Sequence, residues 1–232
     1  MGNNYGGRYN VDIVMCIDAT GSMGPLIDTV KANALSFYHD FTARLAEKDK
    51  TVNEIRVKVI AFRDYLAQME DGNEAMLMSD FFRLPEQAEQ FEALIKSIEP
   101  LGGGDNPEDG LEALAYAIKS KWNKAEGKKR HVIVIWTDDA THDLGFGKRA
   151  PNYPAKMAKS FSELSEWWGV GQSPNGVMDR RAKRLLIYAP PVESWTTIAS
   201  TWDNVLLFPS SAAQGLDEVT YSQILDSLCG SV

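Results

Sequence analysis

Short apolar runs alternate with amphipathic stretches along most of this chain. Residues 11–17 form an almost unbroken apolar run, which is typical of a strand buried on both faces. Residues 27–45 instead place large apolar side chains at spacings of three and four, so one helix is predicted there. Pro25 suits the first position of that helix.

The same two patterns recur to the end of the sequence. The further strands are predicted at 55–65, 76–84, 132–136, 185–189 and 205–208. The further helices are predicted to begin near Pro85 and, with Asn106 as N-cap, at Pro107, and to cover 155–168, 193–202 and 221–228. The alternation predicts an α/β fold with a doubly wound, mostly parallel sheet flanked by helices. Only strand 76–84, after a short gap, is expected to pair antiparallel, at the sheet edge.

The predicted strands and helices belong to one domain, 10–232, after a flexible N-terminus, 1–9. A length of 232 residues favours a single large domain. One connection is unusually long, because a crossover needs only about a dozen residues. We therefore expect a loop-rich insertion around 139–181, with the helix 155–168 inside it.

Composition narrows the class of protein. The chain is 44% hydrophobic, enough for a sizeable core, and its net charge of −8 disfavours a nucleic-acid partner. The two cysteines, Cys16 and Cys229, have no metal-binding spacing. We expect Cys16 in the core and Cys229 as an accessible thiol. Without a signal-like segment or a long apolar run, a cytoplasmic protein with no membrane partner is expected.

Acidic and hydroxyl side chains follow the predicted strands at their carboxyl ends, where open parallel sheets bind ligands. They are Asp18, Thr20, Ser22, Asp64, Asp105, Asp109, Asp138, Asp139, His142 and Asp143. Lysines and arginines precede the strands at the opposite edge. Oxygen ligands without a histidine cluster favour a hard divalent cation, Mg²⁺ with Mn²⁺ or Ca²⁺ as alternatives. Arg63 and Asp64 are interpreted as an ion pair or loop anchor, and His142 as an exposed loop residue.

The turn from Asp18 to Ser22, Asp-Ala-Thr-Gly-Ser, matches the D-x-[ST]-x-S signature of the metal-ion-dependent adhesion site. Asp105 in a later loop and Asp138 at a strand end stand where the second and third parts of that site would be. The chain thus resembles von Willebrand factor type A (vWA) domains, most of all the branch found in bacteria and beside alpha-kinases. The resemblance implies coordination by the Thr20 and Ser22 hydroxyls, with Asp18 and Asp138 acting partly through water. Asp105 stands where relatives often have threonine.

The resemblance also implies a function. It is non-enzymatic docking of a partner protein through the cation, as an intracellular adaptor in a bacterial stress-response or defence system. The sequence does not identify the partner protein. The alternative is a Mg²⁺-dependent phosphoryl-transfer enzyme with Asp18 as aspartyl nucleophile, similar to haloacid-dehalogenase-like phosphatases. In those phosphatases a second Asp is expected at the position that Thr20 holds in this chain.

Overall fold

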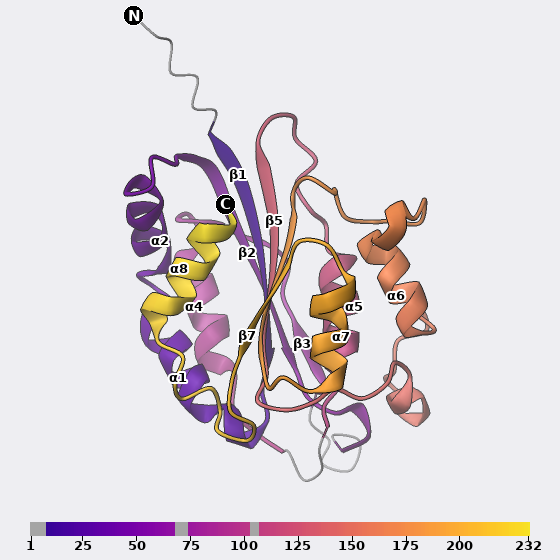
Figure 1. Ribbon diagram of the computed structural model, residues 1–232. Helices are drawn as coiled ribbons and strands as arrows, with labels where there is room; N and C mark the ends of the chain where they lie inside the picture. Colours follow the sequence, from indigo (N-terminus) through magenta and orange to yellow (C-terminus); the bar gives the residue numbers. More distant parts are fainter. Residues whose placement is uncertain (1–7, 68–73, 103–106) are drawn as a thin grey trace, which may run out of the picture.

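The computed structural model describes residues 8–67, 74–102 and 107–232 (Figure 1). Within these ranges seven strands form one sheet, in the order β3-β2-β1-β5-β6-β7, and β4 pairs with β2 beside β3. The long strands are β1 (Tyr9–Asp18), β2 (Val52–Phe62), β5 (Lys129–Trp136), β6 (Lys183–Ala189) and β7 (Val205–Pro209). These five strands run parallel to one another, so the predicted α/β fold is confirmed.

The antiparallel edge is also confirmed, but it consists of two short strands. Both β3 (Met76–Met78) and β4 (Phe82–Leu84) pair antiparallel with β2. The single predicted strand 76–84 is therefore wrong. Ser79 interrupts it, because the Ser79 side chain accepts a hydrogen bond from the Val59 amide at 3.0 Å and replaces a ladder partner.

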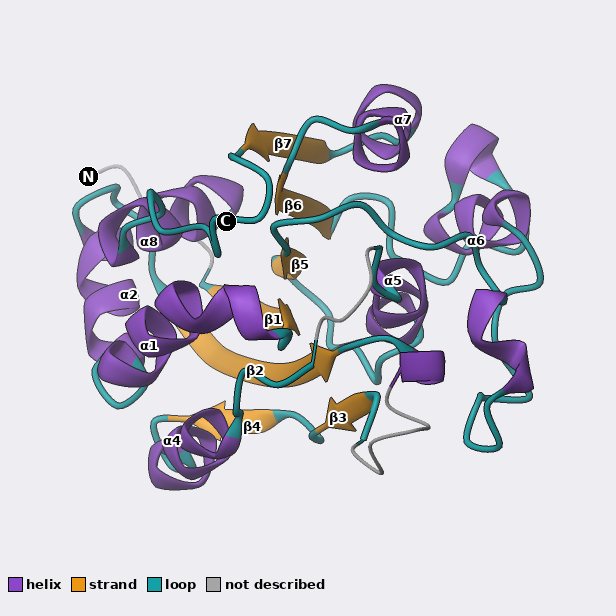
Figure 2. Ribbon diagram, turned by 90° about the horizontal axis from the view of Figure 1, so that it is seen from below, coloured by secondary structure: helices purple, strands orange, loops and turns teal. Residues whose placement is uncertain are grey.

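Helices cover both faces of the sheet (Figure 2). One face carries α1 (Gly24–Asn33), α2 (Phe37–Ala46), α4 (Ala88–Ser97) and α8 (Tyr221–Ser231). The other carries α5 (Gly110–Ile118), α6 (Phe161–Trp168) and α7 (Glu193–Thr201). Each face has its own core: the first lies under α1, α2, α4 and α8, and the second under α5, α6 and α7. Side chains of β1 alternate between them, so that Ile13 and Met15 face the first core and Val14 and Cys16 the second. No described helix is both long and apolar enough to cross a bilayer.

The predicted helix 27–45 is wrong as a single element, because it is broken between α1 and α2. Asn33 Nδ2 donates to the Thr29 carbonyl at 2.7 Å, and Ser36 Oγ donates to the Asn33 carbonyl at 3.2 Å. Polar side chains thus take up carbonyls near the end of α1 and favour a turn. The apolar periodicity continues across the break because both helices pack on the same core.

Helix α5 begins at Gly110 and not at Pro107, so that predicted start is also wrong. Glu108 forms a parallel bridge with Thr141, and its carbonyl accepts a hydrogen bond from the His142 amide at 2.9 Å. This pairing holds the segment extended until the helix starts. The predicted N-cap, Asn106, lies outside the described residues.

The segment 139–181 contains α6 and two short 3₁₀ helices, Phe146–Arg149 and Val170–Gln172. Leu164 and Trp168 of α6 are fully buried in the second core. Cys16 lies in the core as expected. Cys229 is equally buried, so the expectation of an accessible thiol is wrong.

Candidate functional site

Strand β1 ends at Asp18, whose carboxylate is fully buried between the ends of β1 and β5. Asp18 Oδ1 accepts hydrogen bonds from the Thr20 amide at 2.9 Å and the Thr20 hydroxyl at 2.6 Å. Asp18 Oδ2 accepts one from the Thr137 hydroxyl at 2.7 Å. Both carboxylate oxygens are therefore held in fixed positions.

A second contact joins the same turn to the end of β5. Ser22 Oγ donates to Asp138 Oδ1 at 3.0 Å, and Asp138 Oδ2 accepts a hydrogen bond from the Gly215 amide at 2.8 Å. Asp138 is buried, whereas Ser22 is exposed. The structure thus brings together four of the five predicted ligands, Asp18, Thr20, Ser22 and Asp138, at the carboxyl edge of the sheet.

Asp105, the fifth predicted ligand, lies outside the described residues. The loop that leads to it is nevertheless attached to the Asp18 turn. The Gly21 amide donates to the Gly102 carbonyl at 3.1 Å, and the Leu101 amide donates to the Ala19 carbonyl at 3.0 Å. Helix α1 starts at Gly24, directly after the turn, so its positive dipole end lies beside the site.

The charges at this edge favour a cation. Burial raises the pKa of Asp18 to about 6; hydrogen bonds from Thr20 and Thr137 lower it, and the nearby Asp138 raises it further. No basic side chain in the described ranges donates a hydrogen bond to either carboxylate. Arg63 lies close, but its guanidinium donates to the Ala19 and Glu99 carbonyls instead.

These residues fit a hard divalent cation by the chemistry of their donor atoms, which are hydroxyl and carboxylate oxygens. Acidic, histidine and cysteine side chains alone would not form the cation site, because no three of them in the described part of the chain could hold a metal ion. The hydroxyls of Thr20 and Ser22 would have to complete the ligand set.

Asp64 belongs to a different network. His142 Nε2 lies 2.8 Å from Asp64 Oδ2, and the imidazole stacks on Phe146 with ring centroids 3.7 Å apart. Asp64 Oδ1 accepts hydrogen bonds from the Leu66 and Ala67 amides. The loop-anchor interpretation of Asp64 is thus confirmed. The expectation that His142 is exposed is wrong, because it is buried as the partner of Asp64.

Two further buried carboxylates belong to the start of α5, one on its N-cap residue Asp109 and one on Glu112. Asp109 Oδ2 accepts a hydrogen bond from the Tyr65 amide at 2.7 Å, and Glu112 Oε1 accepts one from the Tyr153 hydroxyl at 2.8 Å. Burial raises the pKa of Asp109 to about 8, and the charge of Glu112 contributes in the same direction. Glu112 was not a candidate from the sequence. The only signal was one acidic residue inside an otherwise apolar helix.

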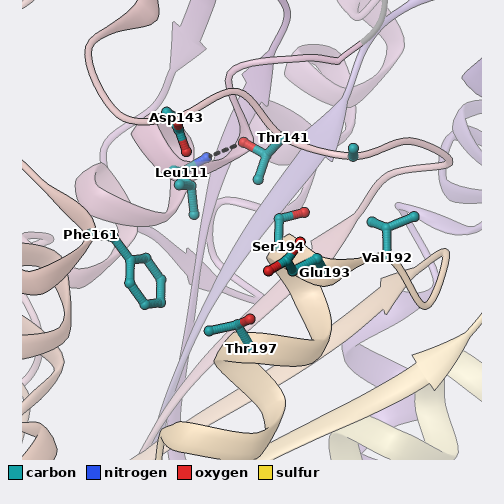
Figure 3. Close-up of a pocket in the computed structure, with 9 residues that line it drawn as sticks. Leu111, Thr141, Asp143, Phe161, Val192, Glu193, Ser194 and Thr197 are labelled. Carbon is teal, nitrogen blue, oxygen red and sulfur yellow. Dashed lines mark hydrogen bonds between the residues drawn. The ribbon is translucent and has the colours of Figure 1, made fainter.

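A cavity of about 490 Å³ opens at the same sheet edge, past the ends of β5 and β6 (Figure 3). Leu111 and Phe161 supply apolar wall, and Asp143 and Glu193 place carboxylates at it. The Leu111 amide donates to Thr141 Oγ1 at 3.0 Å, which fixes the wall of the cavity to the chain after β5.

Comparisons with known proteins bear on the fold. No curated protein matches the chain. Among solved structures, the pilus adhesin SpaC from Lactobacillus rhamnosus GG aligns at 10% identity with a TM-score of 0.54, covering 97% of this chain and 30% of SpaC. Its open conformation aligns at 13% identity and 0.50, with the same coverages. Proximal thread matrix protein 1 from the mussel byssus aligns at 12% identity and 0.48, covering 96% of this chain and 46% of that protein.

The chain thus spans less than half the length of these neighbours, and such low identities bear on the fold alone. The family model of the von Willebrand factor type A domain matches residues 12–173, which is more than half of the sequence. The chain belongs to the von Willebrand factor type A domain family.

Proposed function

We propose that this chain is a cation-dependent docking module for a partner protein. The cation is Mg²⁺, held by Thr20, Ser22 and Asp138, with Asp18 orienting Thr20 and Asp105 as a further ligand. The observation that carries this proposal is the contact of Ser22 Oγ with Asp138 Oδ1 at 3.0 Å, which joins the ends of β1 and β5 around oxygen donors.

The exposure of these residues supports docking of a partner. Asp18 and Asp138 are buried below the turn, while Ser22 and the adjacent Gly21 are exposed. An ion bound there would keep one side toward solvent, where a carboxylate of the partner could complete its coordination. The amino end of α1 favours such an anionic group.

The surroundings offer further contact area. The cavity lined by Thr141 lies on the same edge of the sheet. Phe146, five residues after Thr141, is a large apolar side chain that is 48% exposed. The pilus adhesin among the structural neighbours also favours a binding function. An intracellular adaptor role is part of the proposal, and two free thiols are compatible with a reducing compartment.

No observation favours the phosphoryl-transfer alternative. An aspartyl nucleophile needs a free oxygen within reach of its substrate. Asp18 is fully buried, and both of its oxygens accept hydrogen bonds from threonines. The chemistry of the docking proposal does not need Asp18 to react.

Cation-dependent cross-linking tests the docking proposal. A photoreactive amino acid at Phe146 is expected to give a discrete cross-linked product with a protein of the native cells in Mg²⁺, and none in EDTA. The Ser22→Ala variant should lose the product, since it lacks a cation ligand. Ser200→Ala, an exposed serine on α7, is the control that should retain it. A product that is unaffected by EDTA and by Ser22→Ala would contradict the proposal.

A further inference from the structure

A second cavity, of about 580 Å³, lies at the amino edge of the sheet, away from the candidate cation site. Its walls come from the connection between α5 and β5, from the start of β5 and from the segment before β6. In Figure 1 β5 begins at the top of the molecule, as does the parallel strand β1, which ends at Asp18 on the opposite edge. The charged residues lining it are Lys119, Lys121, Lys124, Lys129, Asp179 and Arg180.

The charge of this cavity is opposite to that of the whole chain. Five of its lining side chains are basic and one is acidic, although the chain carries a net charge of −8. The acidic one, Asp179, is already used: its Oδ2 lies 3.1 Å from Lys129 Nζ, and its Oδ1 accepts a hydrogen bond from the Arg181 amide. The cavity therefore keeps a large excess of positive charge.

The other basic side chains of the cavity have no acidic partner among the described residues. In the described ranges, Lys121, Lys124 and Arg180 form no ion pair, and Lys119 Nζ lies 3.6 Å from the ring centroid of Trp167. Like charges gathered without counter-charges repel one another, so a bound anion would relieve that repulsion.

The floor of the cavity is rigid. Trp122 and His131 are both buried and stack with ring centroids 5.0 Å apart. His131 Nε2 lies 2.9 Å from the Asn123 carbonyl, and the Asn123 amide donates to Asp12 Oδ2 at 2.6 Å. The loop that carries Lys121 and Lys124 is thus fixed at its centre, which lowers the ordering cost of binding.

From this geometry we propose that the cavity binds a small ligand with two or more phosphate groups. Its volume lies in the range of small-molecule pockets, about 300–1,000 Å³, and several ammonium groups and one guanidinium suit phosphate oxygens. The limited volume of the cavity and the acidic whole chain favour a small polyanion over a nucleic acid, which requires an extended basic surface. Nothing in the cation-site proposal is required for this one.

Calorimetric titration with inorganic triphosphate tests the proposal. EDTA is present throughout, so that a metal-bridged phosphate at Ser22 cannot contribute. Saturable binding of one triphosphate per chain is expected, weaker for pyrophosphate and weakest for orthophosphate. The Lys121→Ala/Arg180→Ala double variant should bind about tenfold or more weakly, since it removes two of the cationic groups that would hydrogen-bond to phosphate oxygens.

The matched control is Lys156→Ala/Lys159→Ala, which removes two exposed lysines outside the cavity. It should bind triphosphate as the parent protein does, as should Ser22→Ala. Absence of saturable binding, or equal weakening by both double variants, would overturn the proposal. Tighter binding of a short RNA or DNA with a steep salt dependence would overturn it as well, in favour of a nucleic-acid surface.

Discussion

Replacing Gly215 by alanine is expected to destabilise the protein by about 3 kcal/mol, a large effect for a single substitution in a loop. Gly215 has φ = 62°, which alanine adopts only with strain. A Cβ atom there would also overlap the Ser22 carbonyl oxygen and lie 2.9 Å from Pro25 Cδ. The Gly215 amide, which binds Asp138, would have to move, and Ser22 with it.

Gly171→Ala is the matched control for this substitution. Gly171 has the same φ of 62°, but a Cβ atom there would meet nothing within 4 Å. It should therefore show only the backbone strain, about 1 kcal/mol. Urea unfolding of both variants measures the difference, and equal losses of unfolding free energy would refute the close packing of the 210–216 segment on the Ser22 turn.

Replacing Asp109 by asparagine is expected to stabilise the protein at pH 8 and to flatten its pH dependence. The pKa of Asp109 is about 8 in the folded chain and 3.8 as the ordinary value, so the folded state holds a proton that the unfolded state has released. Raising the pH between these values therefore favours unfolding, by about 1.4 kcal/mol per unit at most. Asparagine is neutral throughout and can still accept the hydrogen bond from Tyr65.

Unfolding free energies at pH 5 and pH 8 test this prediction. The parent protein should lose stability between the two values. Asp109→Asn should lose less, because it lacks one of the buried acids with a raised pKa, while Asp18 and Glu112 remain. Asp143→Asn, a change at an exposed carboxylate, is the control with the parent pH profile. Parallel pH profiles for Asp109→Asn and the parent protein would show that Asp109 is ionised in the fold.

The sequence was sufficient to predict the sheet and most of the candidate site. Buried parallel strands carry almost unbroken apolar runs, and their carboxyl ends meet at one edge, so Asp18 and Asp138 could be placed together from the pattern alone. Thr20 and Ser22 followed from the turn after β1. Because Thr20 and Ser22 follow Asp18 so closely, the turn brings their hydroxyls to Asp18 and Asp138.

The parts that sequence patterns did not predict depend on individual hydrogen bonds between distant segments. Ser79 divides the edge strand through a bond to Val59, and Glu108 delays α5 by pairing with the chain after β5. The burial of His142 depends in the same way on Asp64, 78 residues away. Apolar periodicity carries no information on such contacts, because they join polar groups of the side chains and the backbone.

The most direct test of the central claim is calorimetric titration of Mg²⁺ into chelator-stripped protein and its Ser22→Ala variant. The proposed site predicts saturable binding of one ion per chain, weakened about tenfold or more by loss of the Ser22 hydroxyl. Ser194→Ala, at the same sheet edge but on α7, should leave the affinity unchanged. Absence of saturable Mg²⁺ binding to the parent protein, or equal affinity in Ser22→Ala, would contradict the cation site.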